Sequence, residues 1–203
     1  NDKYGFIKKD GEEITSFIYT SGSQGFSEGL AVVALNKKYG FIDKSGKVVI
    51  PIIYDEARSF YKGLTIAKLK DKYLMIDKNG KKVKELKYDN IYRWAKEDLL
   101  EVVLNKKVGR MNIATGHEII PPIYDEIDNL FELDSFSWVK LNKKWGVIDK
   151  SGKIIIPIQY DEKISSYDAG NNNFIVKINN KYGLLDAYKK ELAEVKYDSI
   201  GRF

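Results

Sequence analysis

The fold is decided by residues 145–161, WGVIDKSGKIIIPIQYD, because residues 39–55 repeat the same line as YGFIDKSGKVVIPIIYD. Four looser copies complete a tandem array of six repeats, each about 35 residues long. An aromatic–glycine step opens the line, and a tyrosine–aspartate pair closes it 15 or 16 residues later. A period of this length indicates that copies of one supersecondary unit are stacked on one another.

The two landmarks locate every repeat. The opening step falls at Tyr4-Gly5, Tyr39-Gly40, Tyr73-Leu74, Val108-Gly109, Trp145-Gly146 and Tyr182-Gly183. The closing pair falls at Tyr19-Thr20, Tyr54-Asp55, Tyr88-Asp89, Tyr124-Asp125, Tyr160-Asp161 and Tyr197-Asp198. Spacing varies more between repeats than within them, so insertions gather after the closing pair, where a surface loop accepts them. We expect one repeat domain over residues 1–203, with repeats one to six starting near residues 1, 30, 64, 99, 136 and 174.

Each repeat has the pattern of a small antiparallel β-meander. In repeat two, an apolar strand at residues 30–35 is followed by a tight reversal and a second strand at residues 39–43. Gly46 supplies the positive φ of the next turn. Pro51 has no N–H, so we expect it to end the third strand. A short fourth strand is expected near Tyr54.

Apolar residues occupy both faces of the predicted strands. Neighbouring residues of a strand point to opposite faces, and residues 30–35 are apolar at every position. Each small sheet must therefore be covered on both sides by its neighbours. The predicted fold class is all-β: six antiparallel units stacked like blades, as a propeller or as an open superhelix. Residues 186–195 alone resemble a helix, but their register with the other repeats predicts a hairpin.

The repeated landmarks are expected to have structural roles. The glycine of the opening step leaves bare backbone, which we expect an aromatic ring from a neighbouring strand or blade to cover. The tyrosine of the closing pair is expected to pack its ring between blades.

Composition excludes several classes of protein. The net charge is +5, but the lysines are spread over turns beside acidic residues, which predicts solvated turn charge and no nucleic-acid partner. No run approaches the ~18 apolar residues of a membrane span, so we expect no insertion into a membrane. The chain has no cysteine, which excludes disulfides and thiolate metal sites.

The aromatic–glycine step, the DKSG turn, the IIP exit and the tyrosine–aspartate pair together resemble the WG-repeat family, also called KWG repeats and found mostly in bacteria. The resemblance covers essentially the whole chain. Repeat three departs from it with Leu74 in place of glycine, and repeat four with Val108 in place of an aromatic residue. The resemblance implies a β-rich repeat scaffold that mediates interaction. It implies no catalytic residue.

No constellation of catalytic residues emerges from the sequence. His117 is the only histidine and occupies a predicted exposed turn. Residues 77–80 (DKNG) have the start of a calcium loop but not its later ligands. Paired carboxylates such as Asp55-Glu56 recur in several repeats, whereas catalysis usually needs one singular constellation. We therefore expect no enzyme, no catalytic residue, no cofactor and no metal site.

Two functions fit these patterns. The first is a scaffold for protein–protein interaction. The second is a carbohydrate or cell-envelope binding module, in which aromatic residues of the variable connections stack on sugar rings. The candidate ligand-binding residues are Tyr61, Trp94 and Tyr167, although the alternative, that such aromatics plug the ends of the array, is favoured for each one taken alone. The expected partner is another protein, with a glycan as the alternative. For a bacterial protein of this kind, we favour the cell envelope or another extracytoplasmic location over the cytoplasm.

Overall fold

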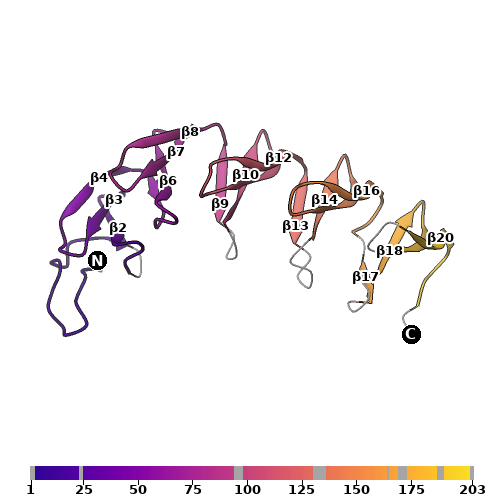
Figure 1. Cartoon of the computed structure of the whole chain (residues 1–203), viewed down its shortest axis with the longest axis horizontal. Coiled ribbons are helices and arrows are strands. Elements are labelled where there is room, and N and C mark those ends of the chain that lie inside the picture. Colours follow the sequence, from indigo (N-terminus) through magenta and orange to yellow (C-terminus); the bar gives the residue numbers. More distant parts are fainter. Residues whose placement is uncertain are drawn as a thin grey trace. The chain divides into compact units, whose positions relative to one another are not determined.

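The computed structural model describes residues 3–22, 25–93, 98–129, 136–163, 165–168, 173–186 and 190–201. These residues form strands, bridges and turns, and none of them is helical (Figure 1). It follows that the described residues contain no apolar helix with the length needed to cross a membrane. The predicted all-β class is confirmed.

The described residues form twenty strands in five antiparallel sheets, each made of four consecutive strands (Figure 1). The sheet of repeat two contains β1 (Ser21–Gly22), β2 (Leu30–Leu35), β3 (Lys38–Asp43) and β4 (Val48–Tyr54). Repeat three contains β5 (Glu56–Ala57), β6 (Leu64–Leu69), β7 (Lys72–Asp77) and β8 (Lys82–Leu86). Repeat four contains β9 (Asn90–Arg93), β10 (Leu99–Leu104), β11 (Lys107–Asn112) and β12 (Glu118–Tyr124). Repeat five contains β13 (Glu126–Asn129), β14 (Phe136–Leu141), β15 (Lys144–Asp149) and β16 (Ile154–Tyr160). Repeat six contains β17 (Ser165–Asp168), β18 (Asn173–Ile178), β19 (Lys181–Leu185) and β20 (Glu191–Tyr197).

The meander predicted for each repeat is present in five of the six. The short strand expected near Tyr54 exists as β5, but it is the first strand of the following sheet. Repeat one is held by two isolated bridges, Tyr4 with Tyr19 and Ile7 with Glu13. The predicted hairpin near the C-terminus is confirmed, because Glu191 begins strand β20.

Two kinds of turn connect the strands of a repeat. Asn36 and Lys37, between β2 and β3, have φ of 50° and 61°. Two successive residues with positive φ form the tight turn that matches the twist of a hairpin. Between β3 and β4, Gly46 has a φ of 85°, as predicted, and the Asp43 carboxylate accepts the backbone N–H of Ser45 at 2.8 Å.

The prediction that Pro51 ends the third strand is wrong. Strand β4 continues through Pro51 to Tyr54, and β16 likewise continues through Pro157. The reason is that β4 and β16 are the outermost strands of their sheets. A proline at a sheet edge removes a donor that the ladder does not need.

The glycine of the opening step is covered by the third strand, and not by the aromatic ring that we expected. The register shifts between Tyr39 and Phe41, which forms a bulge in β4 opposite Gly40. A Cβ atom on Gly40 would lie 2.7 Å from Cα of Ile52 and 2.8 Å from the carbonyl oxygen of Ile50. Only glycine leaves room for backbone this close.

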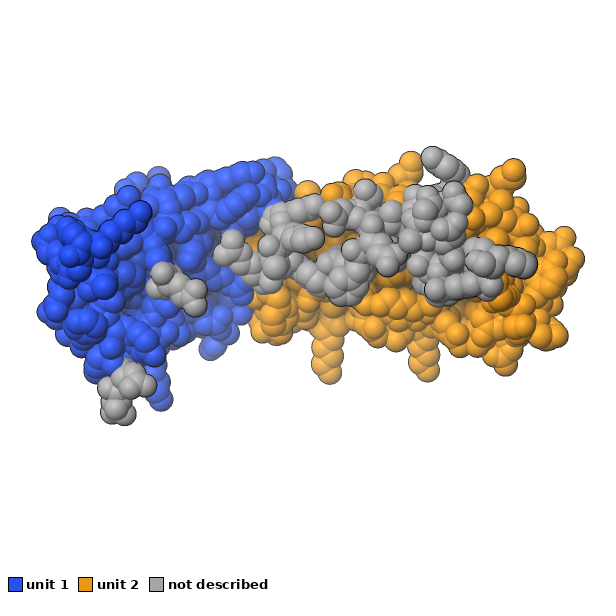
Figure 2. All heavy atoms as spheres, turned by 90° about the horizontal axis from the view of Figure 1, so that it is seen from below, with its two compact units in different colours: residues 1–88, 96–98, 112–117 blue, residues 89–95, 99–111, 118–203 orange. Residues whose placement is uncertain are grey.

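The chain divides into two compact units (Figure 2). Unit 1 contains residues 1–88, 96–98 and 112–117, and unit 2 contains residues 89–95, 99–111 and 118–203. Each unit has apolar clusters between successive repeats. In unit 1, one cluster joins Phe41 and Tyr54 of repeat two to Phe60 and Ile76 of repeat three. In unit 2, another joins Trp138 and Tyr160 of repeat five to Phe174 of repeat six.

These clusters confirm that sheets cover one another and that the closing tyrosines of repeats two and five pack between blades, whereas Tyr197 of repeat six is 44% exposed. The ring centroids of Phe41 and Phe60 lie 4.9 Å apart across two repeats. Tyr54 and Tyr160 are both buried. Burial raises the pKa of the Tyr54 hydroxyl above its usual value.

Candidate interaction site

The aspartate of the closing pair links one repeat to the next. In unit 1, one carboxylate oxygen of Asp55 accepts a hydrogen bond from the Lys38 ammonium of its own repeat. The other oxygen accepts the backbone N–H of Lys70, in the tight turn of repeat three, at 2.8 Å. A turn with positive φ leaves this N–H without a backbone partner in the hairpin, so the carboxylate satisfies it.

The same link recurs in unit 2. The donating backbone N–H belongs to the tight turn of the next repeat in each of three cases: Asn105 to Asp89 at 2.7 Å, Asn142 to Asp125 at 2.8 Å, and Asn179 to Asp161 at 2.6 Å. Hydrogen bonds from lysine ammonium groups, and then from the turn amides, hold the pKa of the Asp55 and Asp161 carboxyls below its usual value. The landmark aspartates are therefore used by the array itself.

Tyr61 is the one predicted ligand-binding residue whose side chain the structure describes. It precedes a tight turn formed by Lys62 and Gly63, and it is partly buried. Its hydroxyl donates a hydrogen bond to one oxygen of Asp98, and the Lys62 ammonium lies 2.5 Å from the other oxygen. Hydrogen bonds from Lys62 and then Tyr61 lower the pKa of the Asp98 carboxyl. The polar end of Tyr61 thus links its own turn to Asp98, which lies directly before β10.

The two other predicted aromatics are described in part or not at all. Trp94 lies outside the described residues. Tyr167 belongs to strand β17, but its side chain is likewise outside the described part of the structure. Ligand binding by these three aromatic residues remains a prediction. Of the other aromatics in the connections, Phe60 is buried in the core, whereas Tyr92 on β9 is 52% exposed.

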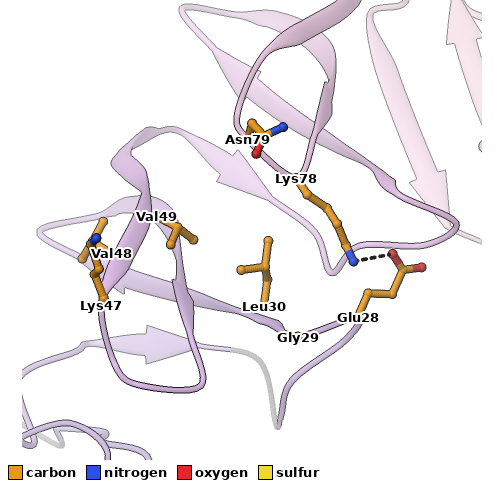
Figure 3. A pocket seen from close by; sticks show the side chains of 8 residues that line it. All are labelled: Glu28, Gly29, Leu30, Lys47, Val48, Val49, Lys78 and Asn79. Atoms are coloured by element: carbon orange, nitrogen blue, oxygen red, sulfur yellow. Dashed lines mark ion pairs between the residues drawn. The ribbon is translucent and has the colours of Figure 1, made fainter.

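A pocket with a volume of about 460 Å³ lies within unit 1, between repeats two and three (Figure 3). One wall is formed by Lys47, Val48 and Val49 at the start of β4. The facing wall is formed by Lys78 and Asn79, in the turn of repeat three, and the segment 28–30 lies between the walls (Figure 3). A volume of this size is typical of ligand sites, which span roughly 300–1,000 Å³.

The pocket combines apolar side chains with charges. Leu30 and Val49 point into it from two strands of one sheet (Figure 3). Glu28 forms an ion pair with Lys78 at 3.5 Å and also accepts the backbone N–H of Gly63 at 2.9 Å. Glu28 has a φ of 53°, so its backbone is held in the left-handed region that most residues avoid. The ion pair places the Lys78 ammonium at the pocket's edge (Figure 3).

The described residues contain no cluster of three or more metal-ligating side chains. His117 lies in an exposed turn, as predicted. The Asp77 carboxylate, which began the calcium-like DKNG motif, accepts the backbone N–H groups of Asn79 and Lys81, each at 2.9 Å. Its lone pairs therefore organise the turn.

The sequence alone did not point to the pocket. Its residues come from three separate segments of two repeats, and no local pattern marks them. One signal was available. Val48 and Val49 are apolar, and Pro51 indicates that their strand lies at the edge of a sheet. An apolar side chain that points away from that edge has no neighbouring strand to cover it. The link through the closing aspartate was also missed, although an aspartate precedes the next tight turn by 15 to 18 residues in four repeats.

Comparison with known families gives one match. The family model described as "WG containing repeat" matches five successive segments: residues 4–39, 39–73, 75–107, 111–145 and 145–182. The matches begin at or near the opening steps of repeats one to five, and they cover most of the chain. No curated protein matches the sequence.

Several solved structures are similar at low sequence identity. A structure titled as the eukaryotic initiation factor has 10% identity and a TM-score of 0.45, over 90% of this chain and 57% of that one. Hsv2 of Kluyveromyces lactis has 6% identity and a TM-score of 0.44, over 89% of this chain and 66% of that one. PorZ of Porphyromonas gingivalis, titled as a bacterial surface component of a type-IX secretion system, has 10% identity and a TM-score of 0.34, over 89% and 27%. The chain thus spans 57% and 66% of the length of the first two.

Proposed function

Because the chain belongs to the WG-containing repeat family, we propose that it is a non-catalytic scaffold that binds another protein. The family's repeats supply a regular array of small sheets, and repeat arrays commonly present extended binding surfaces. The proposal rests on how the chain divides its residues between holding the array together and facing solvent.

The repeated residues hold the array together. The closing tyrosines of repeats two and five are buried, and the closing aspartates bind the turn of the following repeat. The glycines of the opening step accommodate the bulge of the third strand. Residues with these tasks are not available to bind a partner.

The solvent-facing positions vary from repeat to repeat. The residue before the closing tyrosine is exposed in all six repeats, and its size and charge are not constant: Ile18, Ile53, Lys87, Ile123, Gln159 and Lys196. Ile53 and Ile123 are each 47% exposed. A position that is exposed in every repeat but is isoleucine in some repeats and lysine or glutamine in others supports selective recognition, because specificity requires a singular surface on a regular frame. This observation carries the proposal.

The experiment is capture of partners by the full chain from an extract of the cells that make it, with a glycan array in parallel. We expect a saturable protein partner. The variant Ile53→Glu with Ile123→Glu should weaken its binding, because charge replaces exposed apolar surface without disturbing the core. Lys87→Glu, at the equivalent position of repeat three, is the matched control, because it introduces the same glutamate without removing exposed apolar surface.

Two results would overturn the proposal. A specific glycan with no protein partner would favour the carbohydrate-binding function that the aromatic residues predict. Turnover of a substrate by the purified chain would identify an enzyme.

A further inference from the structure

We propose that the pocket between repeats two and three binds an extended peptide segment in which acidic residues alternate with aliphatic ones. This inference rests on the proposed scaffold function and names the chemistry of the partner at one site. It is carried by the composition of the pocket, by its charge and by its difference from the corresponding place in the next repeat.

The apolar part of the pocket fits an aliphatic side chain. Val48 and Val49 are 44% and 37% exposed, and Leu30 lies between them and the facing turn (Figure 3). Each leaves apolar surface in water, which is unfavourable by roughly 25 cal/mol per Å². An inserted valine, leucine or isoleucine would cover this surface from the open side.

The charged part of the pocket fits a carboxylate. The lining contains two lysines, Lys47 and Lys78, and one acidic residue, Glu28. Glu28 is bound to Lys78 and to the Gly63 amide, so it is already neutralised and fixed. The pocket therefore has an excess of one positive charge, and an acidic partner complements it.

Lys47 is the cation best placed to meet an acidic side chain. Its ammonium forms no ion pair with any residue in the described part of the chain. The pKa of the Asp43 carboxyl is lowered mainly by the hydrogen bond from the Ser45 hydroxyl, and the charge of Lys47 adds to this effect. A carboxylate of the partner could therefore form an ion pair with Lys47 without displacing any carboxylate in the described part of the chain.

The pocket is unsuited to a sugar. Its lining residues include no aromatic ring, so a sugar ring has no shelf on which to stack. An extended peptide, by contrast, places alternate side chains on opposite faces, so one face can enter an apolar pocket while the flanking carboxylates reach the lysines at its rim.

The corresponding place in the next repeat has different chemistry. There Lys82 stands at the position of Val48, while Ala114 and Thr115 stand at the positions of Lys78 and Asn79. Lys82 thus replaces one valine of the apolar wall, although Val83 keeps the position of Val49, and no lysine stands at the position of Lys78. Lys81, however, occupies the same exposed turn position as Lys47, which makes Lys81 a matched control for charge.

The test uses the full chain and fluorescein-labelled octapeptides that alternate Asp or Glu with Val, Leu or Ile. Binding is measured by fluorescence anisotropy, and its location by methyl chemical shifts of Leu30, Val48 and Val49. We expect dissociation constants in the range of about 10–500 μM, because one open pocket buries little surface. Lys47→Glu should weaken binding about tenfold and Val48→Ser about threefold, whereas Lys81→Glu should leave it unchanged.

Peptides with Lys in place of the acidic residues should not bind. The proposal fails if no acidic–aliphatic peptide binds below 1 mM, which is roughly the weakest affinity worth assigning to a site. It also fails if Lys47→Glu and Lys81→Glu weaken binding equally, or if the pocket methyls respond only to an oligosaccharide. Lys47 and Val48 are exposed, so these variants are expected to fold. A Lys47→Glu chain that loses the peptides but keeps its cellular protein partner at full affinity would show that the partner does not use the pocket. That result would overturn this inference while leaving the scaffold function intact.

Discussion

Repeats two and three contain the same kind of hairpin but pair its strands differently. In repeat two, Tyr39 lies opposite Tyr54 and Phe41 opposite Ile50, so four positions of β4 span two positions of β3. In repeat three, Tyr73 lies opposite Leu86 and Met75 opposite Lys84, so the strands advance equally. Both hairpins shift register at the next position, but only the first has the bulge between Tyr39 and Phe41, and the equivalent part of the second is regular.

The residue between the paired positions accounts for the difference. Repeat two has Gly40, and its bulge brings the third strand to within about 3 Å of a Cβ at that position. Repeat three has Leu74, whose side chain would occupy that space. Repeat six separates the effect of glycine from that of proline: it has Gly183 and the bulged register, although Glu194 stands at the position of Pro51. The comparison therefore teaches that glycine admits the bulge.

The register also decides which ion pair forms. In the bulged hairpin, Lys38 binds Asp55 of the closing pair. In the regular hairpin, the equivalent Lys72 binds Glu85 at 2.6 Å, and Glu85 stands where repeat two has its proline. One glycine thus fixes the course of a strand and the partner of a lysine.

The largest expected effect comes from placing leucine where the bulge requires glycine. Gly40→Leu should lower the free energy of unfolding by about 3 kcal/mol, since the new side chain meets backbone atoms that cannot move without repacking. Leu74→Ala in the regular hairpin should lower it by only about 1 kcal/mol, because Leu74 is partly exposed and meets no bulge. Urea unfolding followed by circular dichroism measures both; equal losses would contradict the comparison.

The second prediction sharpens the comparison by converting one hairpin into the other. Adding Pro51→Glu to Gly40→Leu should recover at least about 1 kcal/mol, because the third strand can then donate to a regular ladder as β8 does. The same unfolding measurement, arranged as a double-mutant cycle, gives the coupling. Strict additivity of the two changes would show that the registers are not exchanged in this way.

The third prediction concerns the rerouted ion pair. Lys38→Met should raise the pKa of the Asp55 carboxyl, which is lowered first by its hydrogen bond from Lys38. Lys72→Met should likewise raise the pKa of Glu85, which is lowered first by Lys72. Titration by NMR of side-chain carboxyl carbons reads both. A response of Asp55 to Lys72→Met would argue against the two registers.

The smallest expected effect is the pH dependence of stability. The Asp55, Asp125 and Asp161 carboxyls have a lowered pKa in the folded chain, each first because of a hydrogen bond from a lysine ammonium. Their contribution is therefore complete above the ordinary value of 3.8 and is lost as the pH falls through the lower folded values. The urea midpoint should stay level from pH 8 to about 5 and then fall below about pH 4. Asp55→Asn should make that fall shallower; an unchanged curve would rule out a role for this aspartate.

Much of the fold could be predicted from the sequence because its signals are local. The apolar run at residues 30–35 and the tight turn after it predicted β2 and the start of β3, and Gly46 predicted the next turn. Whether Pro51 ends a strand depends on whether that strand is at an edge, and strand order within the sheet is not written locally. The bulge over Gly40 likewise depends on a register between strands.

The candidate site was less predictable than the fold. The aromatic residues of the connections were visible in the sequence, but the hydroxyl of Tyr61 donates a hydrogen bond to Asp98, which lies 37 residues further along the chain. The pocket needs Glu28, Val48 and Lys78 to meet from three segments. Such meetings depend on how consecutive repeats stack, which the repeat period alone does not specify.

The aspartate links all point the same way along the chain. Each carboxylate binds the central hairpin of the repeat that follows it, so the hairpins of repeats three to six are each held from the N-terminal side. During synthesis on a ribosome, each aspartate leaves the ribosome before the hairpin that it binds. Each new sheet therefore joins a chain in which the carboxylate that binds it is already present. The array is thereby built with a polarity, and the loss of one aspartate loosens the blade downstream of it.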